Sequence, residues 1–302
     1  MKLSVIVPCL NAEATLAQQL EAIASQQWAE KWELIIADNG STDKSVEIAR
    51  NYKDAFSHFK IIDASARRGG SSAINMGIQA ANSGHVAVCD ADDEVEPGWV
   101  ASIGEALKTH DIVCGRFLFD KFNDSQTAKS QAEAWKNGLF TGRFLPGGGS
   151  GNFGVRRVLH DRIGGFDECL PHAYDADYFW RIQLEGFPLH YLPEAAIQIR
   201  VGRVNPSLHS LYRRSKIRFA ANYWCYKRYR VHGMLPPPSL KGSVAQWVYT
   251  IKNGACGGLQ KRPNWDSWLK NLAQQTGELV GQVQGRLTNP CKPYHPQKMN
   301  LG

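Results

Sequence analysis

The chain has 302 residues, of which 43% are hydrophobic and 21% are charged. This composition is typical of a folded chain with a sizeable core, and it excludes a disordered or fibrous protein. No apolar stretch approaches the roughly 18 residues of a spanning helix, and no cleavage site follows the first residues. We therefore expect neither a membrane span nor a signal peptide. The seven cysteines are scattered without a C-x-x-C pair, which predicts reduced thiols and a cytoplasmic location.

The charge is divided unevenly along the chain. Residues 1–200 contain 19 basic and 26 acidic residues, whereas residues 201–302 contain 16 basic residues and only two acidic ones. The overall net charge of +7 therefore comes from the last third of the chain, which follows an acidic body.

The first 120 residues predict strands that alternate with helices. Short apolar runs rich in Val and Ile indicate strands at 3–7, 33–37, 59–62, 85–89 and 111–114. Segments of helical period lie between them, starting near Asn11, after Asp43, at Ser72 and after Pro97. This alternation predicts an α/β fold with a parallel sheet that is covered on both faces.

The rest of the chain differs in character from this first part. Residues 120–160 include the glycine-rich run Gly147–Gly151 and predict a mobile loop. Beyond residue 205 we expect a basic helix at Ser207–Arg230 and an amphipathic helix that starts with a cap at Asn264 and ends near Leu287. The predicted domains are residues 1–204 and a basic, largely helical region at 205–302.

Acidic and amide side chains follow the predicted strands. They are Asn11, Asp38 with Asn39, Asp63, and the run Asp90-Ala91-Asp92-Asp93. Ligands bind at the carboxyl ends of strands in open parallel sheets, and paired carboxylates can hold Mg²⁺ or Mn²⁺ against a phosphate. The usual glycine-rich phosphate motifs are missing there. A D-x-D triplet alone would equally fit an ordinary solvated turn.

The triplet occurs together with further segments in a set order. Val5-Ile6-Val7-Pro8 with Asn11, the turn Asp38–Asp43, Asn75 with Gly77, and Asp90–Asp93 are followed by Gly164–Glu168 and Asp175-Ala176-Asp177. As an ordered set over residues 3–195, they resemble family 2 of the inverting glycosyltransferases. The resemblance implies a GT-A-type, mostly parallel sheet flanked by helices, with a C-terminal helical extension. Its nucleotide-sugar half would be residues 1–115 and its acceptor half 116–204.

The resemblance also implies roles for individual residues. Asp175 would be the catalytic base, Asp92 the principal metal ligand with Asp90 beside it, and Asp177 and Trp180 would lie on the acceptor side. The donor would contact Pro8, Asn11, Asp38, Asn39, Arg68 and Asp90.

The chain also departs from the family pattern at several positions. Leu10 stands where an aromatic residue is common, Ile74 where an arginine is common, and Tyr174 where a glutamate is common. A histidine that some members use as a metal ligand is replaced near Ile199–Arg200. The Q-x-x-R-W signature of processive synthases is missing, which favours addition of a single sugar.

The expected activity is metal-assisted transfer of a sugar, with inversion, from a UDP, GDP or dTDP donor. The acceptor would be a hydroxyl of a glycan or of a lipid-linked molecule in cell-surface glycan or glycolipid synthesis. A non-catalytic nucleotide-sugar-binding relative is one alternative. A nucleic-acid-binding protein is another, although acidic strand ends without metal would repel phosphate, and we expect no nucleic-acid partner. A sugar nucleotidyltransferase would carry a G-x-G-T-R-like loop, whereas this chain has Pro8-Cys9-Leu10-Asn11.

Two interpretations of the basic C-terminal region remain open. Its cations and amphipathic helix would suit peripheral attachment to an anionic, cytoplasmic membrane face. They would equally suit a helical subdomain that docks on the catalytic domain and leaves its basic side solvated.

Overall fold

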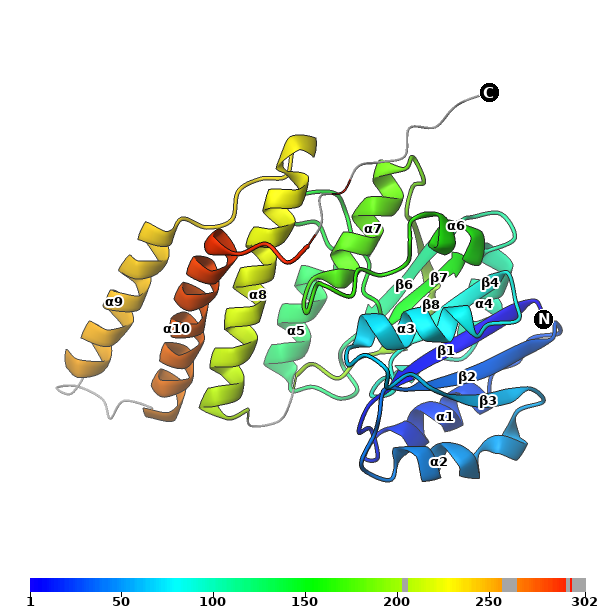
Figure 1. The fold of residues 1–302 in the computed structure, drawn as a ribbon. Coiled ribbons are helices and arrows are strands. Elements are labelled where there is room, and N and C mark those ends of the chain that lie inside the picture. The colour runs from blue at the N-terminus through cyan, green and yellow to red at the C-terminus, as the bar shows by residue number, and fades with distance from the viewer. Residues whose placement is uncertain (203–205, 257–264, 292–293, 295–302) are drawn as a thin grey trace. The chain divides into compact units, whose positions relative to one another are not determined.

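The computed structural model describes residues 1–202, 206–256, 265–291 and 294 (Figure 1). Its internal contacts divide the chain into two units. The first unit comprises Met1–Glu168 and Tyr174–Val201, and the second comprises Cys169–Ala173 and Gly202–His295. The expected domain boundary at residue 204 falls on residues 203–205, outside the described residues.

The first unit is built on one eight-stranded sheet with the strand order β3-β2-β1-β4-β7-β6-β8-β5. The strands are β1 (Leu3–Cys9), β2 (Trp32–Asp38), β3 (Phe59–Asp63), β4 (His85–Cys89), β5 (Glu94–Val95), β6 (Ile112–Leu118), β7 (Asn152–Arg156) and β8 (His190–Gln198). Strands β7 and β5 run against the other six. The expected mostly parallel α/β sheet is therefore confirmed.

Helices cover both faces of this sheet (Figure 1). They are α1 (Leu16–Ala24), α2 (Ser45–Asn51), α3 (Gly70–Gln79), α4 (Trp99–Ala106), α5 (Ser125–Ala134), α6 (Arg157–Arg162) and α7 (Tyr174–Leu184), with a 3-10 turn at Lys53–Ala55. Val5 and Val7 of β1 pack in one core with α1 and α4, whereas Ile6 packs in the other core with α3 and α7. Each such buried side chain contributes roughly 1.5–3 kcal/mol, so the continuous apolar strands hold both layers together.

The prediction of a mobile loop over residues 120–160 is wrong. The segment contains α5, β7 and the start of α6, and β7 lies between β4 and β6 inside the sheet. A Cβ atom on Gly154 would overlap with the side chain of Ile103, so the close packing of α4 on β7 requires glycine there. Because this glycine stands in the middle of β7, the strand lacks the Val-rich pattern of the other strands.

The second unit consists of α8 (Leu208–Tyr229), a 3-10 turn at Arg230–His232, α9 (Leu240–Cys256) and α10 (Trp265–Leu287). The two helices expected here, α8 and α10, are confirmed, whereas α9 was not expected. The Ser207 side chain caps α8 by accepting a hydrogen bond from the backbone N–H of Ser210. The predicted cap Asn264 lies outside the described residues.

Helix α10 packs closely on α8 through Gly277, Gly281 and Gly285, which are spaced four residues apart. Cβ atoms on Gly277 and Gly281 would overlap with the carbonyl oxygens of Tyr212 and Lys216. The missing side chains therefore allow the two backbones to approach each other. Among the described residues, no helix has both the length and the apolar character required to cross a bilayer.

Candidate active site

Three carboxylates gather in the loop after β4. Ligand oxygens of Asp90, Asp92 and Asp93 all lie within 4.8 Å of one another. The buried Gln19 of α1 holds the loop, since its side-chain amide donates a 2.8 Å hydrogen bond to the carbonyl of Asp90 and accepts a 3.0 Å bond from the backbone N–H of Val95. Packing of α1 on the sheet thus fixes where these carboxylates lie.

Burial and nearby negative charges raise the pKa of two of these carboxylates. Burial, together with the neighbouring charges of Asp92 and Asp175, raises the pKa of Asp90 to about 7. Burial and the charge of Asp90 raise the pKa of Asp93 to about 8, although Asp93 also accepts a 3.0 Å hydrogen bond from the backbone N–H of Arg200. A divalent cation would offset this repulsion, and carboxylate oxygens are the ligands that Mg²⁺ and Mn²⁺ prefer. The residues present therefore fit such an ion.

The next polar group along the same sheet edge follows β2. The amide nitrogen of Asn39 donates hydrogen bonds to the carbonyls of Ala64 (2.5 Å) and Arg67 (2.8 Å), and its oxygen accepts one from the backbone N–H of Gly69 (2.8 Å). Asn39 is only 2% exposed. It therefore joins the loop after β2 to the loop after β3, and its side chain is occupied by this structural role.

The other predicted donor residues lie around the turn after β2. Asn11 has a φ of 51°, which is in the left-handed region, and its side chain accepts a 2.8 Å hydrogen bond from the backbone N–H of Thr42. The Asp38 carboxylate accepts a 3.1 Å bond from the backbone N–H of Ser41. A Cβ atom on Gly40 would lie 3.3 Å from the guanidinium of Arg68. The structure thus brings Asn11, Asp38 and Arg68 to one turn, next to Pro8 near the end of β1.

Asp175 lies in the first turn of α7 and lines a cavity together with Asp90 of the acidic loop. The cavity has a volume of about 290 Å³ and is lined by Asp90, Phe117, Phe119, Gln131, Trp135, Gly149, Ser150, Gly151, Asp175, Ile199 and Val201. Burial raises the pKa of Asp175, whose carboxylate accepts a 2.8 Å hydrogen bond from the N–H of Ala176. Carboxylates from two distant parts of the sequence therefore line one small, mainly apolar hollow.

The same fold and order of segments occur in known proteins. A sequence model of the family described as "Glycosyl transferase family 2" matches residues 4–165 of this chain. The chain belongs to this family. The match spans β1 to β7, the acidic loop and the turn after α6, whereas α7 with Asp175 and strand β8 lie beyond it.

Two curated relatives of this family 2 chain come from bacteria. The uncharacterized glycosyltransferase YibD of Escherichia coli is 44% identical over 96 residues, which are 32% of this chain and 27% of the relative. The probable glycosyltransferase YdaM of Bacillus subtilis is 26% identical over 213 residues, or 64% of this chain and 49% of the relative. The chain thus spans between about a quarter and a half of these relatives' lengths.

Two solved structures share the fold of this family 2 chain. The mannosyltransferase PcManGT from Pyrobaculum calidifontis, solved with GDP-Man and Mn²⁺, has a TM-score of 0.58 and 17% identity over 94% of this chain and 87% of its own. Residues 1–349 of S. aureus TarS, solved with UDP-GlcNAc, have a TM-score of 0.50 and 15% identity over 96% and 93% of the two chains. At these identities the likeness concerns the fold.

Two predicted acceptor-side residues of this family 2 chain do not line the cavity. The Asp177 side chain is fully buried, and its carboxylate accepts a 2.8 Å hydrogen bond from the Nε of Arg181. The Trp180 indole is 9% exposed and donates a 2.8 Å hydrogen bond to the carbonyl of Leu145. The Asp177 contact lies within α7, and the Trp180 contact joins α7 to the segment before β7, so neither of these contacts involves a residue that lines the cavity.

Sequence reasoning missed three side chains near the acidic loop. Asp93 was noted only as part of the acidic run, although it joins the carboxylate cluster. The Tyr174 hydroxyl shares a hydrogen bond with Ser150 and would lie 2.9 Å from a Cβ atom on Gly70. The Arg200 guanidinium stacks 3.5 Å from the ring centre of Phe122 and donates a hydrogen bond to Gln18. For Tyr174 and Arg200, the only indication in the sequence was that these positions depart from the family pattern.

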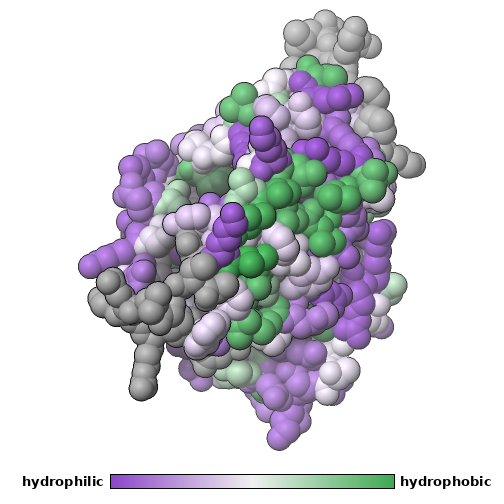
Figure 2. Space-filling model, turned by 90° about the vertical axis from the view of Figure 1, so that its left-hand side faces the viewer, coloured by the Kyte–Doolittle hydropathy of each residue, from purple (hydrophilic) through white to green (hydrophobic). Residues whose placement is uncertain are grey.

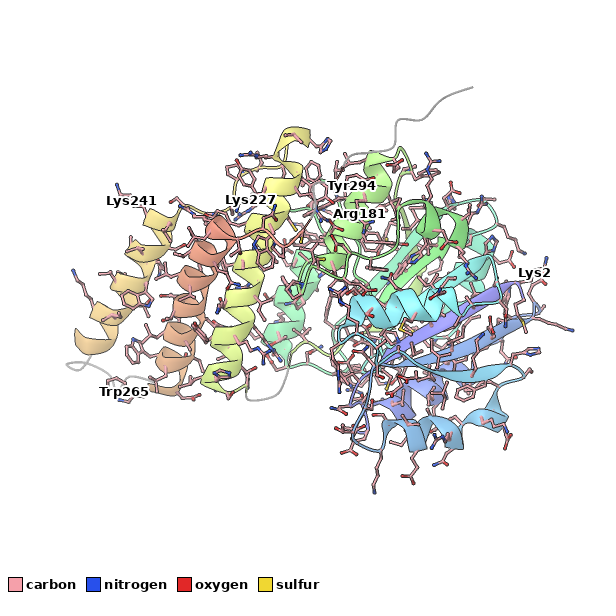
Figure 3. All side chains as sticks on the ribbon, viewed as in Figure 1. Lys2, Arg181, Lys227, Lys241, Trp265 and Tyr294 are labelled. Carbon is pink, nitrogen blue, oxygen red and sulfur yellow. The ribbon has the colours of Figure 1, made fainter. Side chains whose placement is uncertain are left out.

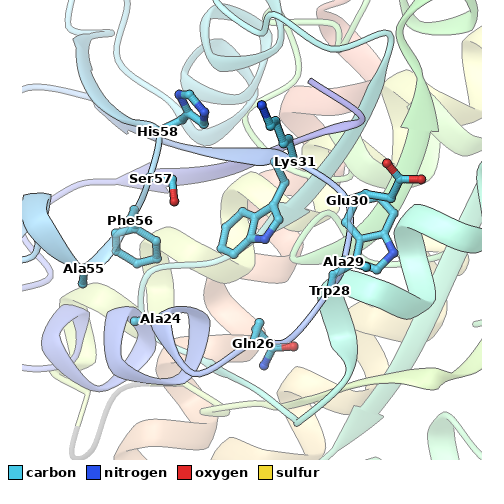
Figure 4. Close-up of a pocket in the computed structure, with 11 residues that line it drawn as sticks. Ala24, Gln26, Trp28, Ala29, Glu30, Lys31, Ala55, Phe56, Ser57 and His58 are labelled. Carbon is cyan, nitrogen blue, oxygen red and sulfur yellow. The ribbon is translucent and has the colours of Figure 1, made fainter.

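A second hollow, of about 310 Å³, lies at the amino ends of β2 and β3 (Figure 4). The rings of Trp32 and Phe56 meet edge to face there with centres 6.0 Å apart, and the Trp28 indole donates a 3.0 Å hydrogen bond to Glu105. All three aromatic side chains also pack against the core. The hollow contains none of the predicted site residues, so we assign it no role in the reaction.

Proposed function

We propose that this family 2 chain transfers one sugar from a nucleotide diphosphate donor of the UDP, GDP or dTDP type to an acceptor hydroxyl, with inversion at the anomeric carbon. The observation that carries the proposal is the cavity lined by both Asp90 and Asp175. It brings Asp90, one member of the carboxylate cluster suited to a cation, and the separate carboxylate of Asp175 to one hollow. This arrangement suits a reaction in which a leaving group departs as a nucleophile is deprotonated.

Asp90 and Asp92 would hold Mg²⁺ or Mn²⁺, with the Asp93 carboxylate within reach of the same point. When bound, such an ion supplies Lewis-acid stabilisation of the charge that develops on the departing diphosphate. Asp38, Arg68 and Asn11 would contact the nucleotide from the turn after β2. Pro8 and Asn39 would shape that turn, since the Asn39 side chain already bonds to the backbone on each side.

Asp175 would act as the base. A hydroxyl group is a weak nucleophile, so a carboxylate must take its proton as the new glycosidic bond forms. A raised pKa makes a carboxylate a stronger base, and burial raises the pKa of Asp175. One base that activates the acceptor opposite a single leaving group gives direct displacement, and direct displacement inverts the configuration.

We also propose that the acceptor is an intermediate of cell-surface glycan or glycolipid synthesis, and that the reaction takes place on the cytoplasmic side. The apolar rings of Phe117, Phe119 and Trp135 support a carbohydrate acceptor, because sugar rings pack on aromatic side chains with their C–H faces. Lipid-linked and free glycans share this chemistry, so both acceptor types belong in the test below.

The decisive experiment incubates the full chain with a panel of nucleotide sugars and glycan or lipid-linked acceptors, with and without Mn²⁺. We expect metal-dependent release of a nucleoside diphosphate with one donor, together with a product of inverted anomeric configuration. Asp92→Asn should lose the metal-dependent part, whereas Asp54→Asn, at an exposed residue of the 3-10 turn Lys53–Ala55, serves as the matched control. Release of pyrophosphate would instead identify a nucleotidyltransferase. A donor-induced thermal shift without turnover would identify a non-catalytic binding protein.

A further inference from the structure

Exposed apolar side chains are concentrated on two helices of the second unit. Helices α9 and α10 carry eight large apolar side chains that are between 37% and 80% exposed: Val244, Val248, Tyr249, Trp265, Leu269, Val280, Val283 and Leu287. Scattered exposed apolar residues are normal in folded proteins, but a contiguous group marks an interaction surface. We call this group the α9–α10 apolar face.

The spacing of these residues places them on one side of each helix. On α9, Val244, Val248 and Tyr249 fall at i, i+4 and i+5, and exposed lysines precede and follow them at 241 and 252. On α10, positions 265, 269, 280, 283 and 287 fall within about 60° of one another at 3.6 residues per turn. Each helix therefore presents an apolar stripe, and the stripe of α9 has a cation at each end.

The two stripes meet at a shallow groove. Its volume is about 590 Å³, and it is lined by Lys216, Leu240, Val244, Leu279, Val280, Val283 and Gln284. Figure 2 shows apolar side chains gathered in a band on this side, with hydrophilic side chains along both of its edges. Lys241 and Trp265 lie at opposite ends of the helix pair, so the face extends along the helices (Figure 3). It is thus long, apolar and bordered by cations.

The charge of the helices indicates what covers this face. Helices α8, α9 and α10 together contain ten Lys and Arg residues but only Asp266 and Glu278 as acidic residues. Both acidic side chains already have partners, since Asp266 pairs with Lys270 at 2.6 Å and Glu278 accepts a 2.6 Å hydrogen bond from Ser243. A second copy of the chain would bring the same excess of positive charge and would be repelled. An anionic surface would be attracted.

We propose that the α9–α10 apolar face docks on an anionic phospholipid bilayer, with its apolar side chains at the headgroup boundary and its lysines on lipid phosphates. This combination of an apolar stripe and flanking cations is what interfacial helices use, and each Lys or Arg adds to the attraction of an anionic leaflet. Docking requires neither donor nor acceptor. Failure of the docking proposal would therefore leave the proposed transferase activity intact, and the reverse also holds.

The test measures sedimentation of the full chain with vesicles of phosphatidylcholine alone or of phosphatidylcholine with about one third phosphatidylglycerol. We expect binding to the anionic vesicles that is at least about tenfold stronger than to the neutral ones, and that weakens as salt rises from about 0.1 M to about 1 M. Equal binding to both vesicle types, or binding to neither, would overturn the proposal.

Paired variants separate the apolar and ionic contributions. Val248→Glu with Val283→Glu, and separately Lys241→Glu with Lys252→Glu, should each weaken binding to anionic vesicles about tenfold or more. The matched controls lie in the first unit: Val158→Glu, at a 72% exposed valine of α6, and Lys53→Glu with Lys129→Glu at exposed lysines. These controls should bind like the wild type, and an equal loss in them would contradict the assignment to this face.

The same samples test the alternative that a second copy of the chain covers the α9–α10 apolar face. Size-exclusion chromatography with light scattering, carried out without lipid, should show the wild type and the Val248→Glu/Val283→Glu variant at the same monomer mass. A wild-type dimer that this variant dissociates would show that a second copy covers the face, and it would overturn the bilayer proposal. Helical circular dichroism of each variant checks that α9 and α10 remain folded.

Discussion

The two units of this chain handle charge and apolar surface in opposite ways. In the first unit, apolar side chains are buried on both faces of the sheet, and carboxylates gather where strands β2 and β4 end. In the second unit, α9 and α10 leave apolar side chains exposed, and cations outnumber acids by ten to two over its three α-helices. The uneven charge of the sequence thus corresponds to two surfaces with different chemistry, one shaped around a small hollow and one open to contact.

Within the first unit, a similar contrast separates two aspartates that lie two residues apart on α7. Asp175 lines the cavity, whereas Asp177 is buried against Arg181. Of the two, only Asp175 is therefore exposed to the hollow in which we propose that the reaction takes place. The following experiments test these contrasts, starting with the largest expected effect.

Asp177→Ala should lower the free energy of unfolding by about 3–5 kcal/mol, because it removes a buried carboxylate that accepts a 2.8 Å hydrogen bond from the buried Arg181 guanidinium. Denaturant unfolding measures this loss. The control is Asp161→Ala, which removes a half-exposed ion pair with Arg157 at 3.6 Å and should cost less than about 1 kcal/mol. Equal losses in the two variants would show that the Asp177 pair is no stronger than a surface contact.

The free energy of unfolding should depend on pH through the protonation of His160. This side chain is 5% exposed, and its Nδ1 lies 3.0 Å from the Tyr178 hydroxyl. Burial, aided by Arg181 and Arg157, lowers its pKa from 6.5 to about 4. Between these values the unfolded chain binds a proton that the folded chain does not. The contribution of His160 is therefore present above pH 6.5 and is lost as the pH falls toward 4, by up to about 3 kcal/mol.

The measurement for His160 compares urea unfolding of the wild type and of His160→Gln across this pH range. We expect the wild-type free energy of unfolding to fall more steeply than that of the variant as the pH decreases. The difference between the two slopes isolates this histidine from the other groups that titrate. Parallel curves would show that His160 titrates as it does in water.

Asp175→Asn should reduce sugar transfer by about two orders of magnitude or more, which corresponds to about 2.7 kcal/mol in the barrier. Donor binding, measured by calorimetry, should be retained because the metal and nucleotide residues are unchanged. The substitution keeps the size of the side chain, so the free energy of unfolding should change little. Near-normal turnover would refute the role of Asp175 as the base.

Gly281→Ala should destabilise the second unit by about 1–3 kcal/mol, because the new methyl group would overlap with the carbonyl oxygen of Lys216 on α8. Gly242→Ala, on the exposed first turn of α9, should instead be neutral or stabilise by up to about 1 kcal/mol through helix propensity. Thermal unfolding followed by circular dichroism compares the two variants. A tolerated alanine at position 281 would indicate that α8 and α10 pack less closely than the structure shows.

The sequence was informative where residue type and position act locally. The apolar runs at 3–7 and 85–89 predicted β1 and β4, and the polar residues after β1, β2 and β4 predicted which sheet edge carries the site. The order of the motifs predicted the family. Strand β7 was not predicted because its central glycine removes the usual pattern, and its place depends on pairing with distant strands.

The candidate site was predicted less completely than the fold. The pattern D-x-D indicated Asp90 and Asp92, but contact between Asp93 and the backbone of Arg200, more than 100 residues away, could not be inferred from local spacing. Asp177 was misjudged because its position in the first turn of α7 resembles that of Asp175. The two positions point to different sides of α7, so Asp175 lines the hollow whereas Asp177 pairs with Arg181. Which side of a helix is buried depends on the segments that pack on it, and local spacing does not reveal them.

Gly151 offers a way to separate catalysis from attachment without altering a charged group. A Cβ atom at this position would overlap with the Asp90 carboxylate, so even alanine would push into the acidic loop. Gly151→Ala should therefore abolish the proposed sugar transfer, whereas the sequence of the second unit is unchanged. If this variant loses sugar transfer but still binds anionic vesicles like the wild type, attachment to the bilayer does not depend on the reaction.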